Sequence, residues 1–332
     1  MIKKYGYYCI VLLLVIALGG LYIYDKHSIL SLQKDTTKTV EKKKETKKEP
    51  KKEVKKVTVN CIGDSLTLGN GKTSYPSALA AKGFIVNKYG ASQDQAIDGA
   101  IRMHGYLIYC ENITIPASRQ ESVNVTLYSN EGEVLNVLKS KESNFSDVTI
   151  DGIQGVLKYD EARAIHTFTR NEDGELHQIN GKVEIVANDY PTIHKDDINI
   201  IWLGTYDRYH SLSIYRTIAH IQEIINANGI EKYIVVGLTS KRRFEIVDDM
   251  NKILAESFKE HYYDLRTYLL NNGLNDAGIT PTLEDQGDLT NRRIPSSLLD
   301  DSQLNGNSQF NELLSQQLIQ KMKELNYISE DN

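Results

Sequence analysis

The stretch "VTVNCIGDSLTLGNG" at residues 57–71 decides the fold that the sequence predicts, because an apolar segment changes within a few positions into a polar turn. Residues 57–62 have the short, β-branched character of a buried strand. Ser65 then stands where the strand should turn into a helix, at the edge of the sheet where ligands bind in open parallel sheets. Ser65 is therefore a candidate nucleophile, and a simple helix-capping role is the alternative.

Short apolar strands alternate with amphipathic helices along most of the remaining chain. The pattern predicts further strands at 84–89, 198–205 and 232–240, and a strand at 262–270 that runs on into a short helix or loop. It predicts helices at 75–82, 93–104, 213–228, 244–261 and 310–325. This alternation is typical of an α/β fold with a parallel sheet and crossover helices.

The alternation of strands and helices stops between about residues 105 and 196. Short β-branched segments separated by turn residues occupy 112–116, 123–129, 148–159, 164–170 and 182–187. Such a pattern indicates antiparallel strands. We expect a small antiparallel β domain inserted into an α/β domain that spans 57–332.

The first 56 residues differ in kind from the rest of the chain. The run between Lys4 and Asp25 carries no charge and approaches the ~20 apolar residues that a membrane-spanning helix needs. We expect residues 1–25 to be a membrane anchor, with a cleaved signal peptide as the alternative. Residues 26–56 are rich in lysine and glutamate and predict a disordered linker. The expected location is the cell membrane, as a single-pass protein with its large domain outside, although lysines flank the apolar run on both sides.

The charge pattern and the cysteine and histidine spacing argue against several function classes. The net charge is −5 although residues 34–56 are basic, so the large domain is acidic and nucleic acid is not an expected partner. Histidine and cysteine spacings typical of metal sites are missing, and so is the phosphate-binding loop, so we expect no metal and no cofactor. Cys61 and Cys110 are expected to be buried thiols.

Gly63-Asp64-Ser65-Leu66 resembles the motif of the GDSL, or SGNH, hydrolases. "VNKYGASQDQAIDGAIR" at residues 86–102 resembles their second block, in which Gly90 would offer its backbone N–H to an oxyanion. The likeness to large secreted or surface-associated members with a β insertion extends over residues 57–323. It implies a three-layer, flavodoxin-like parallel sheet and ester hydrolysis by Ser65.

The third block departs from the family pattern. The family has Gly-x-Asn-Asp, whereas this chain has Gly204-Thr205-Tyr206-Asp207. Tyr206 can donate a hydrogen bond, but its ring is longer than an asparagine amide. We take Tyr206, together with Asp64 and Asp207 of the two motifs, as candidate oxyanion or binding residues.

The fourth block departs further, because "SLLDDSQLNGNSQF" at residues 297–310 lacks the family's histidine. One register places Gln303 at the position of the base and Asp300 at that of its orienting acid. The other register places Leu304 and Asp301 there. Neither Gln303 nor Leu304 can take a proton from serine. His210 is a speculative substitute base, and His104 and His261 are weaker candidates.

Two functions remain open from the sequence. The first is a membrane-anchored SGNH-type hydrolase, an esterase or deacylase of O-acylated cell-envelope carbohydrate, whose activity the missing base makes doubtful. The second is an inactive relative that binds envelope glycan or a protein partner.

Overall fold

The structure of this protein is a computed structural model that describes residues 56–69, 73–241 and 244–329. The predicted membrane anchor and all but the last residue of the predicted linker lie outside these ranges. None of the helices in the described part combines the length and the apolar character needed to cross a bilayer.

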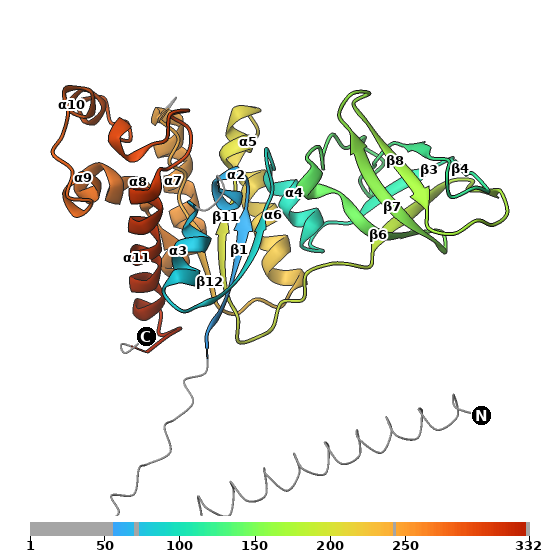
Figure 1. Cartoon of the computed structure of the whole chain (residues 1–332), viewed down its shortest axis with the longest axis horizontal. Coiled ribbons are helices and arrows are strands. Elements are labelled where there is room, and N and C mark those ends of the chain that lie inside the picture. The colour runs from blue at the N-terminus through green and yellow to red at the C-terminus, as the bar shows by residue number, and fades with distance from the viewer. Residues whose placement is uncertain (1–55, 70–72, 242–243, 330–332) are drawn as a thin grey trace, which may run out of the picture. The chain divides into compact units, whose positions relative to one another are not determined.

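A five-stranded parallel sheet forms the centre of the described chain (Figure 1). Its strands are β1 (Thr58–Gly63), β2 (Ile85–Gly90), β11 (Ile198–Trp202), β12 (Tyr233–Val236) and β13 (Tyr262–Tyr263). Their order is β13-β12-β11-β1-β2, and every neighbouring pair is parallel. Counted along the chain this is the order 2-1-3-4-5 of flavodoxin-like folds. The predicted α/β fold with a parallel sheet is confirmed.

Helices cover both faces of this sheet and make a three-layer arrangement. Alternating strand residues point to opposite faces, so Val59 and Cys61 join one buried cluster and Ile62 joins another. The first cluster includes residues of α3 (Tyr75–Ala81), α8 (Leu265–Tyr268) and α11 (Ser308–Glu324). The second includes residues of α4 (Ala96–Arg102), α6 (Ile214–Ala227) and α7 (Phe244–Phe258).

The remaining helices are short and lie between these elements. The α-helices are α2 (Ser65–Leu68), α5 (Thr205–Tyr209), α9 (Leu274–Asp276) and α10 (Leu283–Thr290). The others are the 3-10 turns η1 (Lys141–Ser143), η2 (Lys259–His261) and η4 (Ser296–Leu298), and the π-turn η3 (Leu269–Gly273).

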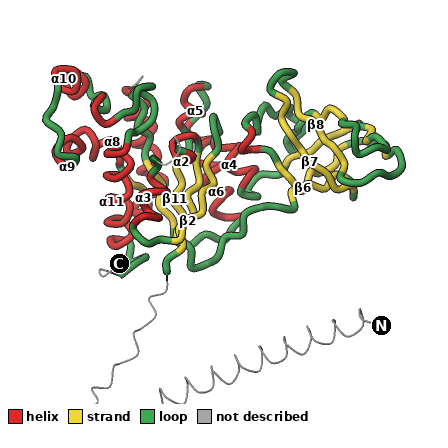
Figure 2. Tube along the Cα trace, viewed as in Figure 1, coloured by secondary structure: helices red, strands yellow, loops and turns green. Residues whose placement is uncertain are grey.

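Between α4 and β11 the chain forms a second, antiparallel sheet, which Figure 2 shows apart from the parallel one. Its strands are β3 (Ile108–Glu111), β5 (Val123–Val125), β6 (Phe145–Ile150), β7 (Ile153–Asp160), β8 (Ile165–Arg170) and β10 (Lys182–Ala187), in the order β3-β10-β6-β7-β8-β5. A small two-stranded sheet pairs β4 (Thr114–Ile115) with β9 (His177–Gln178). A third buried cluster fills this part of the molecule.

The predicted strand at 262–270 differs most from the structure. Only Tyr262 and Tyr263 pair with β12, and Asp264 then accepts a hydrogen bond from the Thr267 N–H at 3.1 Å. This N-cap starts α8 within the predicted strand. The aromatic and leucine residues favour a strand, but the capping residue ends it after two positions.

Candidate active site

A pocket of about 220 Å³ lies at the carboxyl ends of the parallel strands. Its lining comes from segments that follow β1, β2, β11 and β12, and from the loop before α11. Backbones of parallel strands converge at this edge, which is where ligands bind in open α/β sheets. The lining residues are Ser65, Leu66, Ser92, Thr205, Tyr206, Tyr209, Thr239, Ser240, Lys241, Gln303, Leu304 and Asn305.

Ser65 is the first residue of α2 and is half-buried. The preceding Asp64 caps this helix, because its Oδ1 accepts a hydrogen bond from the Leu66 N–H at 2.9 Å. Asp64 is fully buried, and burial raises the pKa of its carboxyl to about 7 although the Leu66 N–H opposes the shift. Asp64 therefore supports the turn that presents Ser65 and does not itself line the pocket.

Gly90 ends β2, directly opposite Gly63 of β1. A Cβ at Gly90 would lie 2.3 Å from the Leu68 backbone nitrogen, so only glycine lets the end of β2 approach α2 this closely. The pocket is lined by Ser92, two residues further on, and not by Gly90. This packing explains the glycine, and its role as an oxyanion donor stays a prediction.

Tyr206 is the polar neighbour that the structure records for the Ser65 hydroxyl. Its phenol oxygen lies 3.4 Å from Ser65 Oγ, and either group can donate. Burial raises the pKa of Tyr206, so the phenol keeps its proton at neutral pH. The ring also packs at 5.8 Å from that of Tyr209, the pocket's other aromatic residue. Tyr206 thus brings a donor to the serine from the place of the family's asparagine.

Asp207 points away from the pocket. Its carboxylate accepts hydrogen bonds from the Ala96 N–H at 2.8 Å and from Thr217 Oγ1 at 3.0 Å. Burial raises the pKa of Asp207, while these hydrogen bonds oppose the shift. The residue joins α5 to the starts of α4 and α6, which gives it a structural role.

Gln303 lies in the pocket wall with both ends of its amide engaged. Its Nε2 donates to the Asp300 carbonyl oxygen at 3.2 Å, and its Oε1 accepts from Lys241 Nζ at 2.9 Å. A carbonyl only accepts and an ammonium only donates, so the two contacts fix which way the amide faces. Leu304 also lines the pocket but is 50% exposed.

The carboxylate of Asp300 organises its own loop. It accepts hydrogen bonds from Ser302 and Asn305, and only the Asp300 backbone carbonyl contacts the Gln303 amide. Partial burial alone would raise the pKa of Asp300, but these hydrogen bonds outweigh it and lower the pKa. Asp301 is exposed. The Asp300 carboxylate, which was expected to orient residue 303, therefore contacts its own loop and not the Gln303 side chain.

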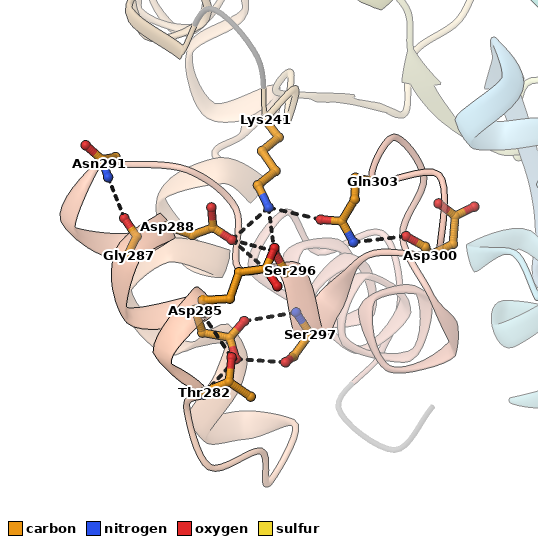
Figure 3. Close-up of polar contacts among 11 residues, drawn as sticks. Lys241, Thr282, Asp285, Gly287, Asp288, Asn291, Ser296, Ser297, Asp300 and Gln303 are labelled. Atoms are coloured by element: carbon orange, nitrogen blue, oxygen red, sulfur yellow. Dashed lines mark hydrogen bonds and ion pairs between the residues drawn. The ribbon is translucent and has the colours of Figure 1, made fainter.

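A different carboxylate reaches residue 303 through Lys241, as Figure 3 shows. Lys241 Nζ lies 2.7 Å from Asp288 Oδ2 of α10 and 2.5 Å from Ser296 Oγ. The Lys241 and Asp288 side chains are only 15% and 7% exposed. The sequence reasoning missed both residues. Lys241 could have been found from its place just after a parallel strand, but Asp288 lies on a helix that the sequence pattern did not indicate.

The three histidines that are candidate substitute bases do not line the pocket. His210 is exposed at the end of α5 and does not line the pocket. His104 stacks on Tyr190 at 4.2 Å. His261 precedes β13 and so lies at the amino ends of the parallel strands, opposite the pocket.

Among the residues that the structure describes, the arrangement offers a nucleophile and hydrogen-bond donors but lacks a proton acceptor for Ser65. Neither a histidine nor a carboxylate is among the residues that line the pocket. Lys241 cannot serve while its ammonium donates to three acceptors, because it then has no lone pair. Within 56–69, 73–241 and 244–329, no group of three His, Cys, Asp or Glu residues is placed to hold a metal ion.

Comparison with known proteins finds similarity at the level of structure. No family model matches the chain, and no curated protein matches it. A lipolytic protein of the G-D-S-L family from Desulfitobacterium hafniense DCB-2 is 13% identical, with a TM-score of 0.42, over 80% of this chain and 99% of that one. A G-D-S-L family member from Veillonella parvula DSM 2008 is 11% identical, with a TM-score of 0.41, over 80% and 97%. A mutant of the esterase AlinE4 is 13% identical, with a TM-score of 0.31, over 71% and 92%.

Proposed function

We propose that this protein is a GDSL-type esterase-like protein that binds O-acylated carbohydrate of the cell envelope in the pocket at Ser65 and does not hydrolyse it efficiently. The observation that carries the proposal is the composition of the pocket. In the described part of the chain its lining combines Ser65 with hydroxyl and amide groups and contains no histidine or carboxylate that could act as a general base. Loss of the histidine of a serine hydrolase lowers turnover on the order of 10⁶-fold.

The pocket chemistry suits a sugar ester. Hydroxyls and amides hydrogen-bond both the sugar hydroxyls and the ester carbonyl, and Tyr206 and Tyr209 offer aromatic surface. The envelope location is part of the same proposal. It rests on residues 1–25 as a membrane anchor and residues 26–56 as a tether that holds the domain outside the membrane.

Hydrolysis and binding are measured on the full chain purified in detergent. We expect wild type and Ser65→Ala to release p-nitrophenol from p-nitrophenyl acetate at the same rate. We also expect saturable binding of O-acetylated polysaccharide that survives Ser65→Ala. Serine-dependent turnover in the wild type would instead make the protein a working esterase.

A pocket-filling variant separates specific from incidental binding. Ser92 lines the pocket, so Ser92→Trp should abolish binding of the O-acetylated polymer, whereas Ser257→Trp, on an exposed position of α7, should not. Equal binding by all variants would place the glycan elsewhere and contradict the proposed site.

A further inference from the structure

The contacts around Gln303 have the opposite polarity to those of a catalytic triad. In a triad, the base accepts a proton from serine on one nitrogen and donates its other N–H to a carboxylate. Here the group behind residue 303 is the Lys241 ammonium, which donates to Gln303 Oε1 at 2.9 Å. A donor thus occupies the place where a hydrolase needs an acceptor.

The ion pair with Asp288 keeps that donor in place. Asp288 Oδ2 lies 2.7 Å from Lys241 Nζ and also accepts hydrogen bonds from the Ser296 N–H and Oγ. Both charged side chains are largely buried, so breaking the pair would leave a buried charge without a partner. The Lys241 Nζ is therefore held against residue 303.

The amide of Gln303 is oriented as a result. Its oxygen is taken by Lys241, and one hydrogen of Nε2 is taken by the Asp300 carbonyl oxygen. The second Nε2 hydrogen remains available to the pocket that Gln303 lines with Ser65 and Tyr206. The pocket that contains Ser65 is thus lined by groups that can donate from α5 and from the loop before α11.

We propose that Lys241 and Asp288 are a positioning pair that fixes residue 303 as a hydrogen-bond donor, so that the pocket receives acceptor oxygens of a ligand and cannot activate Ser65. The proposal rests on the proposed function, because it explains how the pocket binds without hydrolysing. It predicts that a histidine at position 303 is not sufficient for catalysis. Lys241 would hold the imidazole in the tautomer whose lone pair faces away from Ser65.

The test is a set of variants in the Gln303→His background. Lys241→Gln leaves an amide whose NH₂ can donate to Asp288 and whose oxygen can accept the imidazole N–H. Histidine can then take the Ser65 proton while Ser65 Oγ bonds to the acyl carbon, and the ester C–O bond breaks to release p-nitrophenolate. Water, deprotonated by the same histidine, then attacks the acetyl-serine, so acetate leaves and Ser65 regains its proton. Lys241→Arg is the matched control, since arginine keeps the pair with Asp288 but can only donate.

We expect p-nitrophenyl acetate hydrolysis by Q303H/K241Q to exceed that of Q303H and Q303H/K241R by at least ~10²-fold, because a wrong tautomer costs about 10⁴ in a serine protease triad. The gain should vanish with Ser65→Ala and should fall as imidazole protonates below about pH 6. Equal activity of Q303H and Q303H/K241Q, whether high or absent, would overturn the proposal. None of these results depends on whether wild type binds glycan, so the two proposals fail separately.

NMR spectroscopy of the single variants at position 241 tests the proposal even if the double variants fold poorly. The side-chain NH₂ resonances of Gln303, assigned by their loss in Gln303→Ala, should keep their positions in K241R and move in K241Q. Equal shifts in the two variants would show that the polarity of residue 241 does not orient the amide.

Discussion

Asp64 supports the Ser65 turn as a fully buried carboxyl whose Oδ1 accepts a hydrogen bond from the Leu66 N–H. Burial disfavours its charged form and raises its pKa to about 7. The motif at residues 63–66 therefore includes a group that titrates near neutral pH in the folded protein.

Asp64 should make the protein less stable as the pH rises. An aspartate in the unfolded chain titrates near pH 4, so between about pH 4 and 7 the folded state binds more protons, and the free energy of unfolding falls as pH increases. Asp64→Asn keeps an acceptor for the Leu66 N–H and removes the charge. Urea unfolding should show that the free energy of unfolding decreases less between pH 5 and pH 8 for the variant than for wild type. An equal decrease would mean that Asp64 is ionised at both pH values.

Gly90 tests the close contact beside the serine turn. Gly90→Ala should destabilise the protein by about 1–3 kcal/mol, because the new Cβ would lie 2.3 Å from the Leu68 nitrogen. Gly287→Ala is the control, since open space surrounds Gly287 within helix α10 and alanine there should stabilise by about 0.5–1 kcal/mol. Equal effects on the urea midpoint would argue against close packing at Gly90.

Helix α4 connects the parallel sheet with the antiparallel insertion. Arg102 at its end forms an ion pair with Asp94 at 2.6 Å, and Asp94 also accepts from Ser143 Oγ at 2.9 Å. Asp98 of the same helix accepts a hydrogen bond from the Leu138 N–H. Both Ser143 and Leu138 lie between β5 and β6, so these buried carboxylates attach the insertion to the helix that follows β2.

Removing the carboxylate at position 94 should leave Arg102 buried without its partner. The Arg102 side chain is 10% exposed and the Asp94 side chain 2%, so Asp94→Ala should lower the free energy of unfolding by about 3–5 kcal/mol. Asp189→Ala, which removes an exposed acceptor of Ser146, should change it by less than about 0.5 kcal/mol. Similar thermal melting of the two variants would contradict the assigned role of Asp94.

The described chain, taken as a whole, has three buried clusters. Two lie on opposite faces of the parallel sheet, and the third belongs to the insertion together with Ile97 and Ile101 of α4. The insertion therefore has a core of its own, closed by a helix of the α/β part.

A substitution at Ile101 should destabilise the insertion before it destabilises the parallel sheet. Ile101→Ala removes a fully buried side chain from the third cluster, at a cost of about 2–5 kcal/mol. Hydrogen exchange should speed up in β6, β7 and β8 before it does in β1 and β11. Leu318→Ala, in the cluster beneath α11, should produce the reverse order. Uniform acceleration in both variants would mean that the clusters unfold together.

The sequence determined the local features of this protein. Its alternating strands and helices predicted the parallel sheet and the turn after the first strand where Ser65 lies, because both depend on short-range periodicity and turn chemistry. The missing histidine was equally visible in residues 297–310.

Only the tertiary structure decided what surrounds the serine. Lys241, Asp288 and Gln303 are far apart in the chain, and no spacing rule links a loop after β12 to helix α10 and to the loop before α11. For the same reason, the sequence pattern did not predict that Asp94 and Asp98 attach the insertion. Contacts of this kind depend on how helices pack over the sheet, which the hydrophobic pattern of each element does not specify by itself.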